Sequence, residues 1–379
     1  MIFNARHHCV CILLSGVMCC SPNRPRDVVS LLAGSGSNLL DSSQAYSVFS
    51  AMQYFPNETQ LAIGLIIGDS IRYVGVKRQN DSLVYVQNSC SAFEIGSVTK
   101  TLTATMLAKL VYDGEVDLNE PIKNILPVRL HQSALHSKEI TLLHLANHTS
   151  GIPKEPDNIT TDWAIPGSPY KAYDEIKLYD YLTNRLTLQF TPGEKREYSN
   201  LGGGLLGHLL TLRTGKTYEA LLLEYICGPL GMTRTFVTID SARMKYLVPG
   251  RHPQGGIVPN WELNVLTGGG GIKSTAVDLA KYLRAQMTDT TYFFLTQQPT
   301  IQYTEHNTAG LGWAWYSEGN RRFVDATGGT GGYSCIVIFE RSTRTAVILL
   351  TNVSAFLASK GDYISKLGIR LHNSLSVKE

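Results

Sequence analysis

Residues 333–352 read YSCIVIFERSTRTAVILLTN, two apolar runs joined by a polar turn at 341–344. Short runs rich in Ile and Val, with a short polar connection between them, are typical of paired β-strands. We therefore predict two neighbouring strands near the C-terminal end of the chain, over residues 333–340 and 345–352.

Similar runs precede this pair and occur again near the other end of the chain. Residues 311–316 and 322–326 are strand-like, and residues 61–67 and 71–76 flank a Gly-Asp-Ser turn, the pattern of a hairpin. Helical patterns cover residues 97–112, 201–212, 218–225, 275–287 and 356–375, the fourth beginning with a capping box. This arrangement predicts an α+β fold: one antiparallel sheet assembled from both chain ends, flanked by helices, with an inserted α-rich domain.

The domain boundaries follow from the same patterns. We expect an α/β sheet domain formed by residues 45–104 and 272–379, with an inserted helical domain over residues 105–271. Residues 20–44 are rich in Ser, Gly, Asn and Pro and are predicted to be a tether. A cleft between the two domains is the natural place for a site.

The first residues have the layout of a secretory signal. A basic segment at 6–8 precedes an uncharged apolar run at 9–18, which ends at Cys19 and Cys20. The run is too short to cross a hydrocarbon layer of about 30 Å as a helix. Two interpretations remain open: a lipoprotein signal with the lipid anchor on Cys19 or Cys20, or plain cleavage of a signal peptide over residues 1–19. Both place the protein outside the cytoplasm, in the periplasm or cell envelope.

Composition excludes several classes of protein. A chain of 379 residues that is 43% apolar and 17% charged falls in the globular range and outside the disordered one. A formal charge of +3 without a Lys/Arg block lacks the electrostatic footprint of a nucleic-acid-binding protein. Outside the leader, Cys90, Cys227 and Cys335 are too scattered for a disulfide framework or a zinc site. We expect buried free thiols, with one Cys–Cys pair as the alternative.

Ser97 and Lys100 are the first candidates for chemistry. They lie three residues apart at the start of a predicted helix, so both side chains lie on one face, one turn apart. A serine hydroxyl is a weak nucleophile that needs a base, and a lysine can serve when burial disfavours its charged form. The helix N-terminus adds free N–H groups beside the position where negative charge develops. Taken alone, this pair could equally be a helix cap beside a solvated lysine.

Two further motifs follow in the chain. Tyr198 and Asn200, at a loop-to-helix junction, offer a phenol that can relay a proton and an amide that can orient a substrate or the lysine. The glycine-dense loop at 326–333 lies between two predicted strands. Its glycines allow a substrate to lie close against a strand edge, although a flexible hairpin loop would have the same composition.

Together these motifs resemble the serine β-lactamase and penicillin-binding-protein superfamily, in the class C form with Tyr-x-Asn as the middle element. The order and spacing of the three motifs agree with that family. Shorter stretches at 145–153, 229–232 and 270–280 also look like family landmarks. The segment around His148 and the loop at 327–333 most resemble the D-alanyl-D-alanine carboxypeptidase/endopeptidases of the group.

The resemblance implies a role for each position. Ser97 would be the nucleophile, Lys100 its activating partner and Tyr198 the proton relay for acylation and for the leaving amine. Asn200 would hold the substrate amide. The oxyanion hole would be the N–H groups of Ser97 and Gly329. Thr327, followed by Gly328, would contact the substrate from the strand edge.

One position departs from the family pattern. Where the family has Lys or His before the Thr-Gly pair, this chain has Ala326. The cation that would meet a substrate carboxylate and tune the tyrosine is therefore missing from this position. Arg321 and Arg322 are the nearby candidates to replace it.

The resemblance implies a serine hydrolase that acts on D-alanyl peptides of peptidoglycan and is acylated by β-lactams. Because of Ala326, a class C-like β-lactamase or an esterase remains an alternative. A penicillin-binding sensor without turnover is a second alternative.

Two other chemistries are set aside. His144 and His148 have the spacing of a helical zinc pair, but no Glu follows the first, so we expect loop bracing and no metal or other cofactor. Ile95 and Thr99 occupy the positions of the glycines in G-x-S-x-G, which argues against an α/β-hydrolase.

Overall fold

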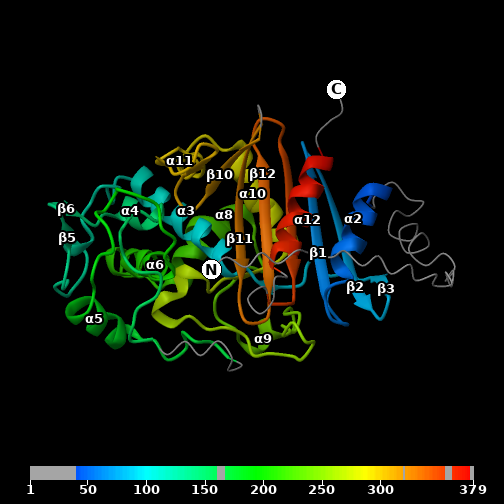
Figure 1. The fold of residues 1–379 in the computed structure, drawn as a ribbon, viewed down its shortest axis with the longest axis horizontal. Coiled ribbons are helices and arrows are strands. Elements are labelled where there is room, and N and C mark those ends of the chain that lie inside the picture. Colours follow the sequence, from blue (N-terminus) through cyan, green and yellow to red (C-terminus); the bar gives the residue numbers. More distant parts are fainter. Residues whose placement is uncertain (1–39, 160–166, 319–320, 355–360, 376–379) are drawn as a thin grey trace, which may run out of the picture.

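The computed structural model describes residues 40–159, 167–318, 321–354 and 361–375 (Figure 1). The predicted signal peptide, the candidate lipid-anchor residues Cys19 and Cys20, and most of the predicted tether lie outside the described residues. Within them, no helix combines the length and the apolar character needed to span a bilayer.

One antiparallel sheet forms the centre of the described structure. Its nine strands follow the order β3-β2-β1-β13-β12-β11-β10-β9-β8. The strands are β1 (Gln60–Ile67), β2 (Ser70–Gln79), β3 (Ser82–Tyr85), β8 (Ile301–Gln302), β9 (Asn307–Ala309), β10 (Ala314–Glu318), β11 (Arg321–Gly329), β12 (Ser334–Glu340) and β13 (Thr345–Thr351). The N-terminal hairpin joins the C-terminal strands because β1 pairs antiparallel with β13. This topology confirms the predicted α+β fold with a sheet assembled from both ends of the chain.

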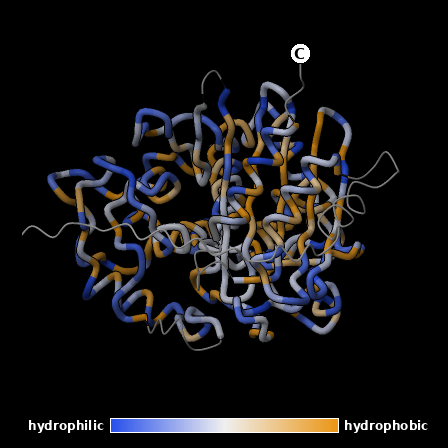
Figure 2. Tube along the Cα trace, turned by 45° about the vertical axis from the view of Figure 1, so that its right-hand side comes forward, coloured by the Kyte–Doolittle hydropathy of each residue, from blue (hydrophilic) through white to orange (hydrophobic). Residues whose placement is uncertain are grey.

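The two central strands, β12 and β13, are buried along their whole length because helices cover both faces of the sheet. Ile336 and Ile338 face one way and pack with α2 (Ser42–Met52) and α12 (Gly361–Ser374). Val337 and Phe339 face the other way, into a core shared with α10 (Ala276–Thr288). Figure 1 shows α12 in front of β12 and α10 behind it. In Figure 2 the hydrophobic stretches gather toward the middle of the sheet, and the peripheral loops are mostly hydrophilic.

Short helices and loops make up most of the region between β3 and α10. Its helices are η1 (Gly96–Val98), α3 (Thr99–Tyr112), η2 (Ile122–Asn124), α4 (Leu142–Ala146), α5 (Glu175–Asn184), α6 (Asn200–Thr214), α7 (Tyr218–Leu222), η3 (Leu223–Cys227), α8 (Gly228–Leu230), α9 (Ser241–Met244) and η4 (Asn264–Gly269). Helix α11 (Tyr292–Leu295) follows α10. Two small sheets pair β4 (Phe93–Glu94) with β7 (Lys273–Ser274) and β5 (Ala134–Leu135) with β6 (Lys138–Glu139). One continuous core links these helices to the sheet, and the division at 104/105 and 271/272 stays a prediction.

The structure differs from the sequence-based prediction at the start of the folded region and at one edge of the sheet. Helix α2 begins at Ser42, where the Asp41 side chain accepts a hydrogen bond from the Gln44 main chain. Residues 42–44 are therefore helical and Gln44 is buried, so the predicted tether is too long by these residues. Strands β8 and β9 were not predicted because they are short and lack an apolar alternation.

Two predicted helix starts also differ in detail. The helix expected from Ser97 begins as a 3-10 turn, and the α-helical part starts at Thr99. At α10 the Thr275 hydroxyl accepts from the Asp278 main chain, as in a capping box. The Asp278 carboxylate instead accepts from the Arg234 main chain at 2.7 Å and the Thr235 hydroxyl at 3.0 Å, which ties α10 to the preceding loop.

Candidate active site

Ser97 and Lys100 lie where the 3-10 turn η1 runs into α3. The Ser97 side chain is half-buried, whereas Lys100 is only 5% exposed. Lys100 Nζ donates to Ser97 Oγ at 3.0 Å, to Asn200 Oδ1 at 2.9 Å and to the carbonyl oxygen of Gly269 at 2.5 Å. The ammonium has three N–H donors. All three are therefore directed at named acceptors, one of which is the predicted nucleophile.

Tyr198 lies close to the same hydroxyl and to Lys100. Its phenol oxygen lies 2.5 Å from Ser97 Oγ, and Lys100 Nζ lies 4.8 Å from the centre of its ring. A phenol and an amine thus both reach the serine oxygen. This arrangement can take a proton from Ser97 and return it to a leaving group.

Helix α6 helps to position Asn200 and Lys100. Asn200 is its first residue and follows the N-cap Ser199, whose hydroxyl accepts from the Gly202 main chain. One turn later Gly203 packs on the aliphatic part of Lys100, where a Cβ atom would lie 2.7 Å from Lys100 Cε. A side chain at Gly203 would therefore displace the lysine from the site.

His148 supports the loop that carries Tyr198. Its Nδ1 accepts a hydrogen bond from the Ser199 main chain at 3.3 Å, and its ring centre lies 4.6 Å from that of Tyr198. Burial lowers the pKa of His148 well below its ordinary value, which keeps the imidazole neutral and able to accept. His144 instead bonds through Nδ1 to the Thr141 main chain at the start of α4. Both histidines thus brace local structure, as the sequence predicted.

The glycine-rich end of β11 lies against Ser97. Strand β10 begins opposite Asp325, at Ala314, so the residues that follow Asp325 on β11 have no ladder partner on that side among the described strands. The turn at η1 occupies part of this edge: a Cβ atom on Gly328 would overlap the carbonyl oxygen of Ile95. Gly96, with φ +46°, lies equally close to the backbone of Gly329, and Thr327 is exposed beside them. The strand edge and the serine therefore belong to one site.

The expected replacements for the cation at Ala326 do not lie near it. Arg321 pairs with Glu340 at 2.7 Å at the far end of β11, and Arg322 is exposed four residues away, about 13 Å along the strand. Another arginine, Arg196, precedes Tyr198 by two residues, and its charge acts on His148 and Asp325. Its guanidinium carbon is 4.6 Å from the centre of the Tyr303 ring.

Arg196 acts on ionisable groups next to the site. Burial raises the pKa of Asp325, the neighbour of Ala326, to about 6, and the charge of Arg196 acts in the opposite direction. The same charge contributes to the low pKa of His148. A positive charge is therefore present near the site, although it comes from the loop before Tyr198 and not from β11.

Two buried residues of opposite charge, Glu94 and Lys273, bind the main chain of a neighbouring loop close to the segment that carries Ser97. Glu94 and Lys273 are register partners in the β4–β7 ladder, and both are 2% exposed. Glu94 accepts from the Trp261 main chain at 2.7 Å, and Lys273 donates to the Trp261 carbonyl at 2.9 Å. Burial raises the pKa of Glu94 and lowers that of Lys273, while their mutual attraction opposes both shifts.

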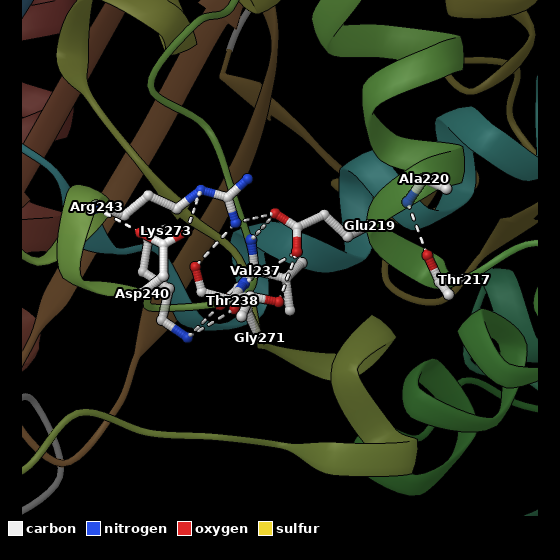
Figure 3. Close-up of polar contacts among 9 residues, drawn as sticks. All are labelled: Thr217, Glu219, Ala220, Val237, Thr238, Asp240, Arg243, Gly271 and Lys273. Carbon is white, nitrogen blue, oxygen red and sulfur yellow. Dashed lines mark hydrogen bonds and ion pairs between the residues drawn. The ribbon is translucent and has the colours of Figure 1, made fainter.

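Figure 3 shows how Lys273 continues into a second polar cluster. Its Nζ also donates to the carbonyls of Gly271 at 3.0 Å and Val237 at 3.3 Å. Next to them, Glu219 accepts from the Val237 main chain at 3.3 Å and from Arg243 at 2.6 Å. These contacts join three segments that are distant in sequence and fix the residues that follow Gly269.

The three cysteines outside the leader are free. Cys227 and Cys335 are buried, as expected, whereas Cys90 is exposed. Cys335 lies behind the site, with Sγ 3.1 Å from the carbonyl oxygen of Ile95.

Comparison with known proteins agrees with this geometry. The family model described as Beta-lactamase matches residues 88–364. The chain belongs to the beta-lactamase family. The resemblance inferred from the three motifs is thereby confirmed, and the matched span contains all of them. As a family member, the chain is expected to be a serine hydrolase.

Individual relatives carry two kinds of name. A D-alanyl-D-alanine-carboxypeptidase/endopeptidase, AmpH of Escherichia coli K12, is 28% identical over 286 residues, covering 70% of this chain and 70% of its own length. A beta-lactamase of Pseudomonas fluorescens is 27% identical over 336 residues, covering 77% and 88%. A solved beta-lactamase/D-alanine carboxypeptidase of Yersinia pestis superposes with a TM-score of 0.72 at 23% identity, covering 85% and 95%. That likeness confirms the fold.

The sequence motifs predicted that Ser97, Lys100, Tyr198 and Asn200 share one site, but they did not predict other parts of it. The Gly269 carbonyl that accepts from Lys100 lies in a run of four glycines at 268–271, and that run was the available signal. Arg196 and Glu155, which accepts a hydrogen bond from the Asn200 amide at 2.6 Å, had no signal, because each is a single charged residue in a loop.

Proposed function

We propose that this protein is a serine hydrolase that forms an acyl-enzyme on Ser97. The observation that carries the proposal is the convergence of Lys100 Nζ and Tyr198 OH on Ser97 Oγ, at 3.0 and 2.5 Å. A hydroxyl with two such neighbours can lose its proton as it attacks a carbonyl, which is the requirement for covalent catalysis.

In the proposed reaction, Ser97 Oγ forms a bond to the substrate carbonyl carbon while its proton passes to the Lys100 and Tyr198 pair, which before the attack carries one proton fewer than an ammonium and a phenol together. The Ser97 and Gly329 N–H groups stabilise the oxyanion. Tyr198 then gives a proton to the leaving amine as the scissile bond breaks, and water later hydrolyses the ester. Asn200 and Thr327, with Gly328, orient the substrate along the free edge of β11.

We infer that the substrates are D-alanyl peptides of peptidoglycan and that β-lactams acylate the same serine. The names of the relatives in Escherichia coli and Yersinia pestis support this substrate class. The leader sequence at 1–19 supports export to the periplasm or cell envelope, with a lipid on Cys19 or Cys20 as one of two interpretations.

A class C-like β-lactamase or an esterase is the second candidate. Ala326 supplies no cation for a substrate carboxylate, which weakens the case for a carboxypeptidase and for an efficient β-lactamase alike and leaves an ester substrate open. A penicillin-binding sensor differs from both by staying acylated. The deciding experiment compares D-Ala release from a muropeptide with turnover of nitrocefin and of a p-nitrophenyl ester.

For a carboxypeptidase we expect D-Ala release by the wild type, its loss in Ser97→Ala, and slower turnover of nitrocefin. Fast nitrocefin or ester turnover without D-Ala release would contradict the peptidase proposal and favour the second candidate. A stable acyl-enzyme with no turnover of any substrate would instead indicate a sensor.

A further inference from the structure

Glu155 lies at the opposite end of the Asn200 amide from Lys100. Its Oε1 accepts from Asn200 Nδ2 at 2.6 Å and from the Tyr170 hydroxyl at 2.9 Å. The other carboxylate oxygen is buried and accepts no hydrogen bond from the described residues. A continuous chain of hydrogen bonds therefore runs from Tyr170 through Glu155, Asn200 and Lys100 to Ser97.

The orientation of the Asn200 amide depends on both of its neighbours. Its oxygen accepts from Lys100 and its NH₂ group donates to Glu155. In the flipped orientation, the NH₂ group would face the Lys100 ammonium and the oxygen would face a carboxylate, so both contacts would lose a donor–acceptor match. An ionised carboxylate at 155 therefore stabilises one orientation only.

We propose that Glu155 is a positioning residue that fixes the Asn200 amide with its oxygen toward Lys100 and thereby aims Lys100 Nζ at Ser97. This role rests on the proposed function, because it concerns the step in which Ser97 is activated. Glu155 itself touches neither Ser97 nor Lys100. It acts through Asn200.

The mechanism requires Glu155 to be ionised. Once protonated, its hydroxyl could donate to the Asn200 oxygen, and the preference for one amide orientation would be lost. Burial raises the pKa of Glu155 above its ordinary value. The groups that act in the opposite direction are the amide of Asn200 and the phenol of Tyr170, by hydrogen bonds, and the charges of Lys100 and Lys154.

The test compares kcat/KM for wild type and Glu155→Gln from about pH 4 to about pH 9, with a substrate that the wild type turns over. Glutamine keeps the shape and one acceptor but not the charge, and neutral hydrogen bonds are weaker than charged ones. We expect the ratio of wild type to variant to be about tenfold above neutral pH. It should fall toward one as the pH drops below the raised pKa of Glu155. Ionisable groups that affect both proteins equally do not change this ratio.

Tyr170→Phe gives an independent test of the same chain. It removes one donor to the carboxylate, so the pKa of Glu155 should rise further and activity should be lost at a higher pH than in the wild type. At alkaline pH its kcat/KM should stay within about threefold. Glu197→Gln is the matched control, because Glu197 lies next to Tyr198 but is exposed and paired with Lys195 at 3.2 Å. Its profile should match the wild type.

A ratio of wild-type to Glu155→Gln kcat/KM that is constant across pH would indicate a merely structural role and overturn the proposal. A Tyr170→Phe profile that does not move toward higher pH would overturn it as well. Failure of the wild type to form an acyl-enzyme would overturn the proposed function and the positioning role together. Acylation of the wild type with an unchanged Glu155→Gln profile would overturn the positioning role alone.

Discussion

Lys100→Met is expected to lower the rate of acylation by about 10³-fold, equivalent to about 4 kcal/mol of transition-state stabilisation. Lys100 donates to Ser97 at 3.0 Å and to Asn200 at 2.9 Å, so its loss removes a partner in the proton transfer and a positioning contact together. Methionine keeps the aliphatic part that packs on Gly203. The measurement is the single-turnover rate with a chromogenic ester or cephalosporin.

Lys109→Met provides the matched control, since it makes the same substitution in the same helix. Lys109 pairs with Asp113 on the outer side of α3, so acylation should change less than about twofold. A Lys100→Met protein that is acylated within tenfold of the wild-type rate would show that another group activates Ser97.

Lys273→Met is expected to destabilise the protein by about 3–5 kcal/mol, because it leaves the buried Glu94 carboxylate without its opposite charge. It also removes the donor to the carbonyls of Trp261, Gly271 and Val237. The loss of stability should be larger at high pH, because there Glu94 cannot take up a proton and so avoid the cost of burying an unpaired charge. The free energy of unfolding in urea measures the effect.

Lys171→Met is the control for this prediction, because Lys171 pairs with Glu262 at 2.7 Å on the surface, where ion pairs contribute little. The double variant Glu94→Gln/Lys273→Met should lose less than the sum of the two single variants. Strict additivity, or a Lys273→Met loss below about 1 kcal/mol, would mean that the two charges do not stabilise each other.

The sheet was largely predictable because its central strands are continuous apolar runs, which few other elements resemble. Residues 345–352 illustrate this, since β13 covers all but the last of them. The same reasoning could not find β8, a pair of residues with one apolar side chain. It also could not place the start of α2, which depends on a single capping aspartate at position 41.

The catalytic cluster was partly predictable for a different reason. Ser97 and Lys100 share one helical turn, and Tyr198 and Asn200 share one loop-to-helix junction, so each pair is local in the sequence. Contacts between segments far apart in the sequence have no such signal. The Gly269 carbonyl and Glu155 are acceptors of this kind. The glycine run at 268–271 is visible in the sequence, but only the fold shows that the Gly269 carbonyl reaches Lys100 and that Glu155 reaches Asn200.

The cation that the family pattern places at position 326 shows the same limit of prediction from sequence. Along β11, Arg321 and Arg322 were the nearest cations in the sequence. In the fold the charge that influences the pKa of Asp325, beside Ala326, is that of Arg196, from the loop before Tyr198. Distance along the chain was a poor guide to distance in space.

The central claim is that Ser97 becomes acylated, and mass spectrometry after incubation with penicillin tests it most directly. Intact mass should increase by one β-lactam, and peptide mapping should place the adduct on the peptide that contains Ser97. Ser97→Ala should show no adduct under the same conditions. An adduct on another residue, or equal labelling of wild type and Ser97→Ala, would contradict the account.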